Sequence, residues 1–144
     1  LMALAKPRTP LSVLFYRKNE VDDGKIYKLA KQIKLHGHLN QLAGELSHGQ
    51  KQWLEIGILL AQEPQLLLID EPAAGMTFSE RAVTTTLLQD LSKTRSVVVV
   101  EHDMEFIRQL NCRITVLHEG SVLAEGQIDF ITQNQDVIDV YLGR

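Results

Sequence analysis

The stretch that decides the fold runs from residue 64 to residue 103 and reads PQLLLIDEPAAGMTFSERAVTTTLLQDLSKTRSVVVVEHD. It contains two short, continuous apolar runs, at residues 66–69 and 97–100. Continuous apolar runs of this length predict strands that are buried on both faces. Residues 79–91 between them carry an apolar face at helical spacing, preceded by a Thr-x-x-Glu capping-box pattern. Strand, helix and strand in this order predict an α/β fold, with a parallel sheet flanked by helices.

Upstream of this stretch the sequence predicts only helices and loops. Apolar residues recur near helical spacing over residues 25–36 and again over residues 48–63. The residues before them predict a short helix and then a loop that ends in an acidic Asp-Asp-Gly turn. We therefore expect a helical subdomain over residues 1–63 and an α/β part over residues 64–144.

Downstream, the pattern predicts one more helix, a β-hairpin and two closing helices. Asp103 is placed to cap the first of these helices, and Glu119-Gly120 is placed to form the turn of the hairpin. The predicted elements are a helix at 104–110, hairpin strands at 114–117 and 122–124, and helices at 128–133 and 136–142.

Composition excludes some classes of protein. The 144 residues are 44% hydrophobic and 23% charged, which is ordinary for one globular domain. A net charge of −3 gives no electrostatic reason to expect a nucleic-acid partner. No apolar run approaches the roughly 20 residues that span a bilayer. The chain starts at Leu1 without a signal-like segment, so we expect it to begin inside a longer polypeptide.

The segment LSHGQ, residues 46–50, lies at the predicted start of a helix. Helix N-termini present unpaired N–H groups and a partial positive charge, and therefore attract phosphate. Gly49 lets a ligand approach the backbone, while Ser47 and Gln50 supply a hydroxyl and an amide. The alternative is a capping box, in which Ser-x-x-Gln satisfies the helix donors with no ligand present.

Asp70 and Glu71 directly follow the first apolar run. In P-loop ATPases an aspartate at this point helps to hold Mg²⁺, and a nearby residue positions the attacking water. Glu71 is therefore a candidate general base. The alternative is an ordinary strand that ends in a polar turn stiffened by Pro72.

His102 follows the second apolar run after one intervening residue. Ligands of parallel sheets bind beyond the carboxyl ends of the strands, so this histidine is placed to hydrogen-bond a terminal phosphate. The alternative is a histidine that faces solvent at a strand end. Three phosphate-handling groups at three element ends, in this order, favour a nucleotide-binding function over three separate coincidences.

These motifs resemble those of the ATP-binding cassette ATPases. LSHGQ resembles the family's signature motif, usually LSGGQ; LLLIDEP resembles its Walker B segment, and His102 occupies the position of its switch histidine. Within the family, the combination of LSHGQKQWLEIG, VLAEG and YLGR is most similar to the ATPase subunits of urea importers, close to those of branched-chain amino acid importers.

The resemblance implies an ATPase of the P-loop type that works as a head-to-tail dimer around two ATP molecules. Ser47, Gly49 and Gln50 would contact the ATP held by the second subunit. On the subunit's own nucleotide, Asp70 would hold Mg²⁺, and Glu71 and His102 would be catalytic. The implied partners are a second ATPase subunit and transmembrane permease subunits, at the cytoplasmic face of the cell membrane, with no nucleic acid.

The chain also departs from the family pattern. His48 replaces a glycine of the signature, and Ala74 and Thr77 stand where Ser and Asp are usual. No G-x-x-x-x-G-K-[ST] phosphate-binding loop is present. We expect that loop to lie before Leu1 in the full protein, and the 144 residues alone to be inactive.

Two other classes of protein stay open at this point. The chromosome-maintenance and DNA-repair ATPases share the signature and Walker B motifs, but they place long coiled-coil heptads before the signature, and no sustained heptad is present here. A non-catalytic interaction module is favoured by the missing phosphate-binding loop and disfavoured by the retained Glu71 and His102.

Overall fold

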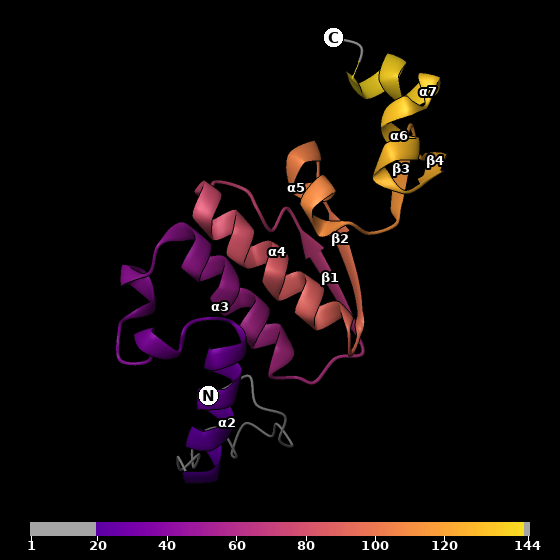
Figure 1. Cartoon of the computed structure of the whole chain (residues 1–144). Helices are drawn as coiled ribbons and strands as arrows, with labels where there is room; N and C mark the ends of the chain where they lie inside the picture. Colours follow the sequence, from indigo (N-terminus) through magenta and orange to yellow (C-terminus); the bar gives the residue numbers. More distant parts are fainter. Residues whose placement is uncertain (1–19, 143–144) are drawn as a thin grey trace. The chain divides into compact units, whose positions relative to one another are not determined.

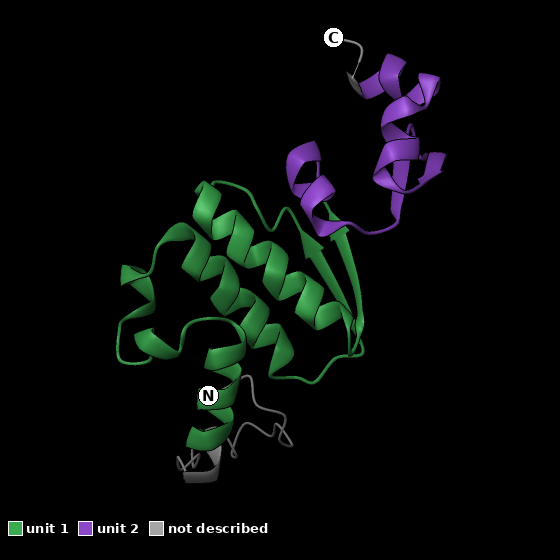
Figure 2. Ribbon diagram, viewed as in Figure 1, with its two compact units in different colours: residues 1–100 green, residues 101–144 purple. Residues whose placement is uncertain are grey.

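The computed structural model describes residues 20–142. These divide into two compact units between Val100 and Glu101, the first unit before this point and the second unit after it (Figure 2). Residues 66–110 run strand, helix, strand, helix, as the α/β prediction requires. Among the described residues, no helix is both long enough and apolar enough to cross a bilayer. The division predicted from the sequence, at residues 63 and 64, stays a prediction.

From residue 20 to residue 65 the chain forms helices, turns and loops, as predicted. This part comprises α2 (Glu20–Gln32), two 3₁₀ turns, η1 (His36–His38) and η2 (Ala43–Glu45), and α3 (His48–Leu60) (Figure 1). The expectation of an acidic turn before Lys25 is wrong, because Asp23 and Gly24 lie inside α2. Acidic residues in the first turn of a helix interact favourably with its dipole, which offsets the low helix propensity of glycine. The short helix predicted before them falls outside the described residues.

The α/β part of the first unit consists of β1 (Leu66–Asp70), α4 (Phe78–Ser92) and β2 (Ser96–Val100). The two strands pair in parallel, with Leu66 opposite Ser96 and Asp70 opposite Val100, so the predicted parallel sheet is confirmed for this pair. The helix that connects them contacts both α3 and β2 (Figure 1). The carboxyl ends of both strands therefore lie at one edge of the sheet.

The prediction that the two strands are buried on both faces, however, is wrong. Leu67 and Ile69 are 2% and 9% exposed, whereas Leu66 and Leu68 between them are 50% and 68% exposed. The second strand alternates in the same way, between half-buried and exposed residues. Side chains along a strand point to opposite faces in turn. The described part of this unit covers only one of those faces.

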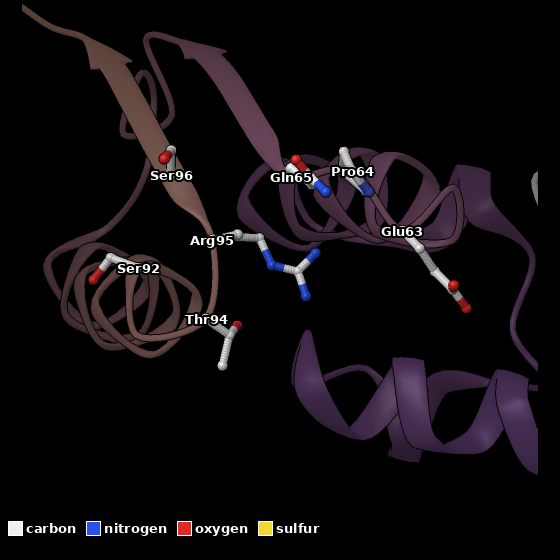
Figure 3. Close-up of a pocket in the computed structure, with 7 residues that line it drawn as sticks. All are labelled: Glu63, Pro64, Gln65, Ser92, Thr94, Arg95 and Ser96. Carbon is white, nitrogen blue, oxygen red and sulfur yellow. The ribbon is translucent and has the colours of Figure 1, made fainter.

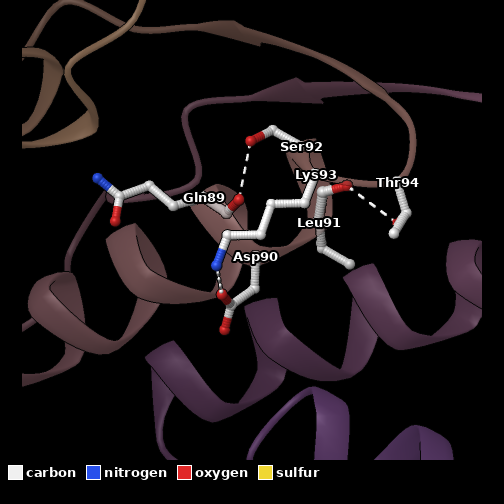
Figure 4. A network of polar contacts seen from close by, with 6 residues as sticks. All are labelled: Gln89, Asp90, Leu91, Ser92, Lys93 and Thr94. Carbon is white, nitrogen blue, oxygen red and sulfur yellow. Dashed lines mark hydrogen bonds and ion pairs between the residues drawn. The ribbon is translucent and has the colours of Figure 1, made fainter.

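The carboxyl-terminal end of α4 is closed by side chains rather than by a glycine. Hydroxyl groups donate to carbonyl groups of the last turn, and a lysine pairs with an aspartate (Figure 4). The contacts are Ser92 Oγ to the Gln89 carbonyl at 2.8 Å, Thr94 Oγ1 to the Leu91 carbonyl at 3.4 Å, and Lys93 Nζ to Asp90 Oδ1 at 2.7 Å. Carbonyl groups that the helix leaves unpaired at this end are thereby satisfied just before the chain enters β2.

The second unit contains the predicted helix, hairpin and closing helices. Its elements are α5 (Met104–Leu110), β3 (Ile114–His118), β4 (Ser121–Gly126), α6 (Ile128–Gln133), α7 (Gln135–Val137) and a π-helical turn, η3 (Ile138–Leu142). Strands β3 and β4 pair antiparallel. The hairpin turn has positive φ angles at both central residues, 47° at Glu119 and 78° at Gly120, the backbone that a tight hairpin turn requires.

Candidate functional site

The LSHGQ segment forms the start of α3 with the capping geometry predicted for it. Ser47 is the N-cap, and its Oγ accepts the Gln50 N–H at 3.2 Å. In return, Gln50 Oε1 accepts the Ser47 N–H at 2.9 Å. The capping box is therefore real. It leaves the Ser47 side chain at the exposed tip of the helix, where a ligand could also reach it.

The amide of Gln50 has a second contact within the helical part. Its Nε2 lies 3.2 Å from His38 Nε2, and His38 Nδ1 lies 2.8 Å from Gln41 Oε1. An amide NH₂ can only donate and an amide oxygen can only accept, so both contacts are satisfied when the histidine proton sits on Nδ1. Gln50 thus ties the LSHGQ segment to the η1 turn.

Asp70 and Glu71 lie where β1 ends, at the carboxyl edge of the parallel pair. Both side chains are exposed. Glu71 adopts a left-handed backbone conformation, with φ 45°, and its N–H donates to the Val100 carbonyl at 2.9 Å. A non-glycine residue in this region costs of order 1–3 kcal/mol and persists where the surrounding structure holds it, often at functional sites. Pairing with β2 therefore fixes the point from which the Glu71 side chain leaves the sheet.

The loop that follows Glu71 packs beneath the LSHGQ segment. Gly75 has φ +66°, and a Cβ at this position would lie 3.2 Å from the His48 ring. The departure of His48 from the usual glycine is thus accommodated by a glycine on the facing loop. Two hydrogen bonds shape the loop, from the Ala74 N–H to the Glu71 carbonyl at 3.1 Å and from the Met76 N–H to the Ala73 carbonyl at 3.2 Å.

Glu80 connects the LSHGQ segment to α4. Its Oε1 accepts the Ser47 hydroxyl at 2.7 Å, and its Oε2 accepts the Thr77 N–H at 2.9 Å in the second capping box. These hydrogen bonds lower the pKa of Glu80 below its ordinary value, and the bond from Ser47 has the largest effect. The sequence pattern identified Glu80 as a cap only. Its contact with Ser47 joins residues 33 positions apart, and no local pattern signals it.

His102 belongs to the second unit, whereas Glu71 belongs to the first. That the two residues act on the same nucleotide therefore stays a prediction. The His102 side chain is exposed, and its N–H donates to Glu101 Oε2 at 3.1 Å. The Asp103 N–H lies 3.4 Å from the same oxygen. Asp103 in turn caps α5, as predicted, through Oδ1 and the N–H groups of Glu105 and Phe106.

The candidate metal ligand at this edge of the sheet is a single carboxylate, that of Asp70, which suits Mg²⁺ better than a metal ion that is held by protein side chains alone. Within residues 20–142, no group of three His, Cys, Asp or Glu side chains is placed to hold a metal ion. Mg²⁺ at phosphate sites is usually held by one or two carboxylates together with phosphates and water. The exposed carboxylate of Asp70 at the strand end meets that requirement.

A separate hollow lies at the opposite, amino-terminal ends of β1 and β2. Figure 3 shows the Arg95 side chain lying in it, among polar residues from the two strand entries and the end of α4. Its lining residues are Glu63, Pro64, Gln65, Ser92, Thr94, Arg95 and Ser96. None of the predicted site residues is among them, and parallel sheets bind ligands at the other edge.

Comparisons with known proteins match the motifs and the fold. The family described as ABC transporter matches residues 6–74. The high-affinity branched-chain amino acid transport ATP-binding protein BraF of Pseudomonas aeruginosa is 36% identical over 115 residues, which cover 78% of this chain and 45% of that protein. LivG of Escherichia coli, of the same description, is 35% identical with the same coverage. The chain thus spans about half the length of the curated relatives it matches.

Solved structures match in the same way. An ATP-binding cassette of an ABC transporter, crystallised in its ADP conformation, has a TM-score of 0.78 and 28% identity, over 95% of this chain and 57% of that one. A nucleotide-free ATP-binding cassette has a TM-score of 0.78 and 27% identity, over 95% of this chain and 58% of that one.

Proposed function

Because this chain belongs to the ATP-binding cassette (ABC) transporter family, we propose that the protein containing it is the ATP-hydrolysing subunit of an importer. The family resemblance seen in the motifs is confirmed by the relatives and solved structures. The observation that carries the proposal is the end of β1, where Asp70 and Glu71 are exposed at the carboxyl edge of the parallel pair. Hydrolysis would drive the uptake of a small solute through membrane partners.

The predicted site residues at element ends divide into two roles. Ser47, Gly49 and Gln50, at the tip of α3, would bind the nucleotide held by a second ATPase subunit. The partial positive charge of a helix N-terminus supports phosphate binding there. Asp70 would hold Mg²⁺, which neutralises phosphate charge when it is bound.

The chemistry at the subunit's own nucleotide would rest on Glu71 and His102. The Glu71 carboxylate would accept a proton from the attacking water, as a general base. Its fixed backbone supports this role, because catalysis of phosphoryl transfer depends on positioning. His102 would hydrogen-bond the terminal phosphate and stabilise its developing charge.

The partners of this subunit would be a second, identical or similar ATPase subunit and transmembrane permease subunits. The helical subdomain, residues 1–63, would lie towards the permease, and residues 64–144 would form the carboxyl-terminal part of the ATPase core. The site of action would be the cytoplasmic face of the cell membrane. The phosphate-binding loop would come from the rest of the full protein, so the 144 residues alone would not hydrolyse ATP.

For the solute we propose urea or a related small amide, with a branched-chain amino acid as the alternative. The urea proposal rests on the LSHGQKQWLEIG, VLAEG and YLGR segments. The alternative is supported by BraF and LivG, whose names state branched-chain amino acid transport. Uptake of labelled urea and labelled leucine, by cells that carry the subunit with its permease, would separate the two. The solute that the importer carries should be taken up in labelled form, and an excess of the same unlabelled solute should suppress that uptake, whereas the other solute should not.

The hydrolysis proposal is tested by Glu71→Gln in the full-length subunit. Removal of a general base should lower kcat by about 10²- to 10⁴-fold while ATP still binds. Glu55→Gln, on the exposed side of α3, removes the same charge away from the site and should leave kcat unchanged. A Glu71→Gln subunit with full ATPase activity would refute the assignment.

A further inference from the structure

The hydroxyl of Ser47 is already occupied by an anion that belongs to the protein itself. A serine hydroxyl has one proton, and the 2.7 Å contact between Ser47 Oγ and Glu80 Oε1 directs that proton to the carboxylate. The length is typical of a charge-assisted O–H···O⁻ hydrogen bond. In addition, Ser47 Oγ accepts a hydrogen bond from the Gln50 N–H at 3.2 Å. In this arrangement Ser47 has no proton to donate to a ligand.

Glu80 is held in position by contacts on both of its oxygens. While Oε1 accepts from Ser47, Oε2 accepts the Thr77 N–H at 2.9 Å and lies 2.8 Å from the Thr77 hydroxyl. The hydrogen bonds that lower its pKa keep the carboxylate charged at neutral pH. One residue thus serves two helix starts, as the capping partner of α4 and the acceptor of the α3 N-cap.

The approach of Glu80 also depends on the backbone of the LSHGQ segment. An ideal Cβ at Gly49 would lie 2.7 Å from Glu80 Cδ and 2.8 Å from Oε1. Real Cβ atoms do not come this close, so the carboxylate occupies space that only a glycine leaves free. Glu80 therefore lies against Gly49 and Ser47, two of the three residues assigned to the nucleotide of the second subunit.

We propose that Glu80 is a positioning residue that takes the place of a nucleotide phosphate at Ser47 and must be displaced when the ATPase dimer closes. This inference rests on the proposed function, because it concerns the same Ser47 contact. Two anions, the Glu80 carboxylate and the phosphate, then compete for one hydroxyl proton. A phosphate that reaches Ser47 must break the hydrogen bond to Glu80 and must approach a fixed negative charge. Glu80 thus raises the ATP concentration needed for closure.

The test measures ATP-driven dimerisation of the full-length subunit by sedimentation velocity, in a Glu71→Gln background that slows hydrolysis. Glu80→Gln is added because glutamine keeps the capping box of α4 and removes the charge. A charged hydrogen bond is no longer broken on closure, so half-maximal dimerisation should need about tenfold less ATP. Glu45→Gln is the matched control, an exposed carboxylate close to Ser47 in the chain, and should leave the ATP requirement unchanged.

A second measurement separates competition at Ser47 from a change in folding. In a Ser47→Ala background the hydrogen bond is gone and only the negative charge of Glu80 remains, so adding Glu80→Gln should lower the ATP requirement by clearly less than it does when Ser47 is present. An ATP requirement that is equal or higher in Glu80→Gln than in the Glu71→Gln parent would overturn the role of Glu80 while leaving the proposed function standing. Absence of any ATP-driven dimer in the Glu71→Gln parent would refute both.

Discussion

A buried hydrogen bond between α3 and α4 provides a direct test of how the first unit is held together. Trp53 Nε1 donates to Thr84 Oγ1 at 2.8 Å, and the two residues are 7% and 0% exposed. The Thr84 hydroxyl also lies 2.9 Å from the Glu80 carbonyl and 3.1 Å from Met76 Sδ. Thr84→Val keeps the shape of the side chain but removes the hydroxyl oxygen that accepts the indole N–H.

The expected cost of Thr84→Val follows from that unpaired donor. A buried donor left without a partner costs about 1–3 kcal/mol, and each kcal/mol lowers the melting temperature of a domain of this size by about 2–4 °C. The measurement is urea unfolding of the full-length protein, followed by far-ultraviolet circular dichroism, with the thermal midpoint as a second readout. The free energy of unfolding should fall by that amount without a change in the urea dependence.

The control is Thr86→Val, two residues along the same helix. Thr86 also bonds the carbonyl four residues before it, Ala82, at 3.0 Å, but its side chain is exposed. Its replacement should change the free energy of unfolding by less than about 0.5 kcal/mol. Replacement of both buried partners, in Trp53→Phe with Thr84→Val, should cost less than the sum of the two single replacements, because no donor is then unpaired. A Thr84→Val protein as stable as Thr86→Val would refute the reasoning.

Three further predictions concern two glycines and the pH dependence of stability. Gly57→Ala places a Cβ 2.5 Å from Ile33 Cδ1, in the buried side chain of Ile33, so the overpacking cost of about 1–3 kcal/mol should cancel or exceed the gain of about 1 kcal/mol that alanine brings to a helix interior, and urea unfolding should show no stabilisation. Gly24→Ala, with nothing within 4 Å, should instead stabilise α2 by about 1 kcal/mol in the same measurement. The pKa of Glu80 is lowered from its ordinary value of 4.5, so the stability it contributes is present above that pH and is lost as the pH falls through the lower folded value. The difference in melting temperature between the wild type and Glu80→Gln should therefore be constant near neutral pH and shrink in acid; a difference that grows in acid would contradict the sign.

The local elements could be predicted from the sequence because their signals lie within a few residues. The Thr77 and Glu80 capping box, the Asp103 cap and the Glu119-Gly120 turn all depend on near neighbours, and each is present in the structure. The acidic turn before Lys25 was predicted wrongly for the same reason. Glycine is a weak helix former, and the pattern of one short segment did not reveal that the helix continues through it.

The burial of the strands and the hydrogen bonds between distant residues of the site could not be predicted in the same way. Whether Leu68 is covered depends on what packs against that face of the sheet, and its apolar character says nothing about that. The hydrogen bond between Ser47 and Glu80 joins residues that are 33 positions apart, and the bond between Trp53 and Thr84 joins residues 31 apart. Contacts of this kind arise only after the helices have packed together.

The sequence by itself determined the order of the elements, the parallel pairing of β1 and β2, the family, and the residues that stand at element ends. These follow from periodicity, capping and motif chemistry, which act over short distances along the chain. Only the tertiary structure decided which strand face is covered, how Glu71 leaves the sheet, and that the Ser47 proton is held by Glu80. The physical reason is that burial and side-chain hydrogen bonds depend on distances in space, and the folded chain brings together groups that the sequence keeps far apart.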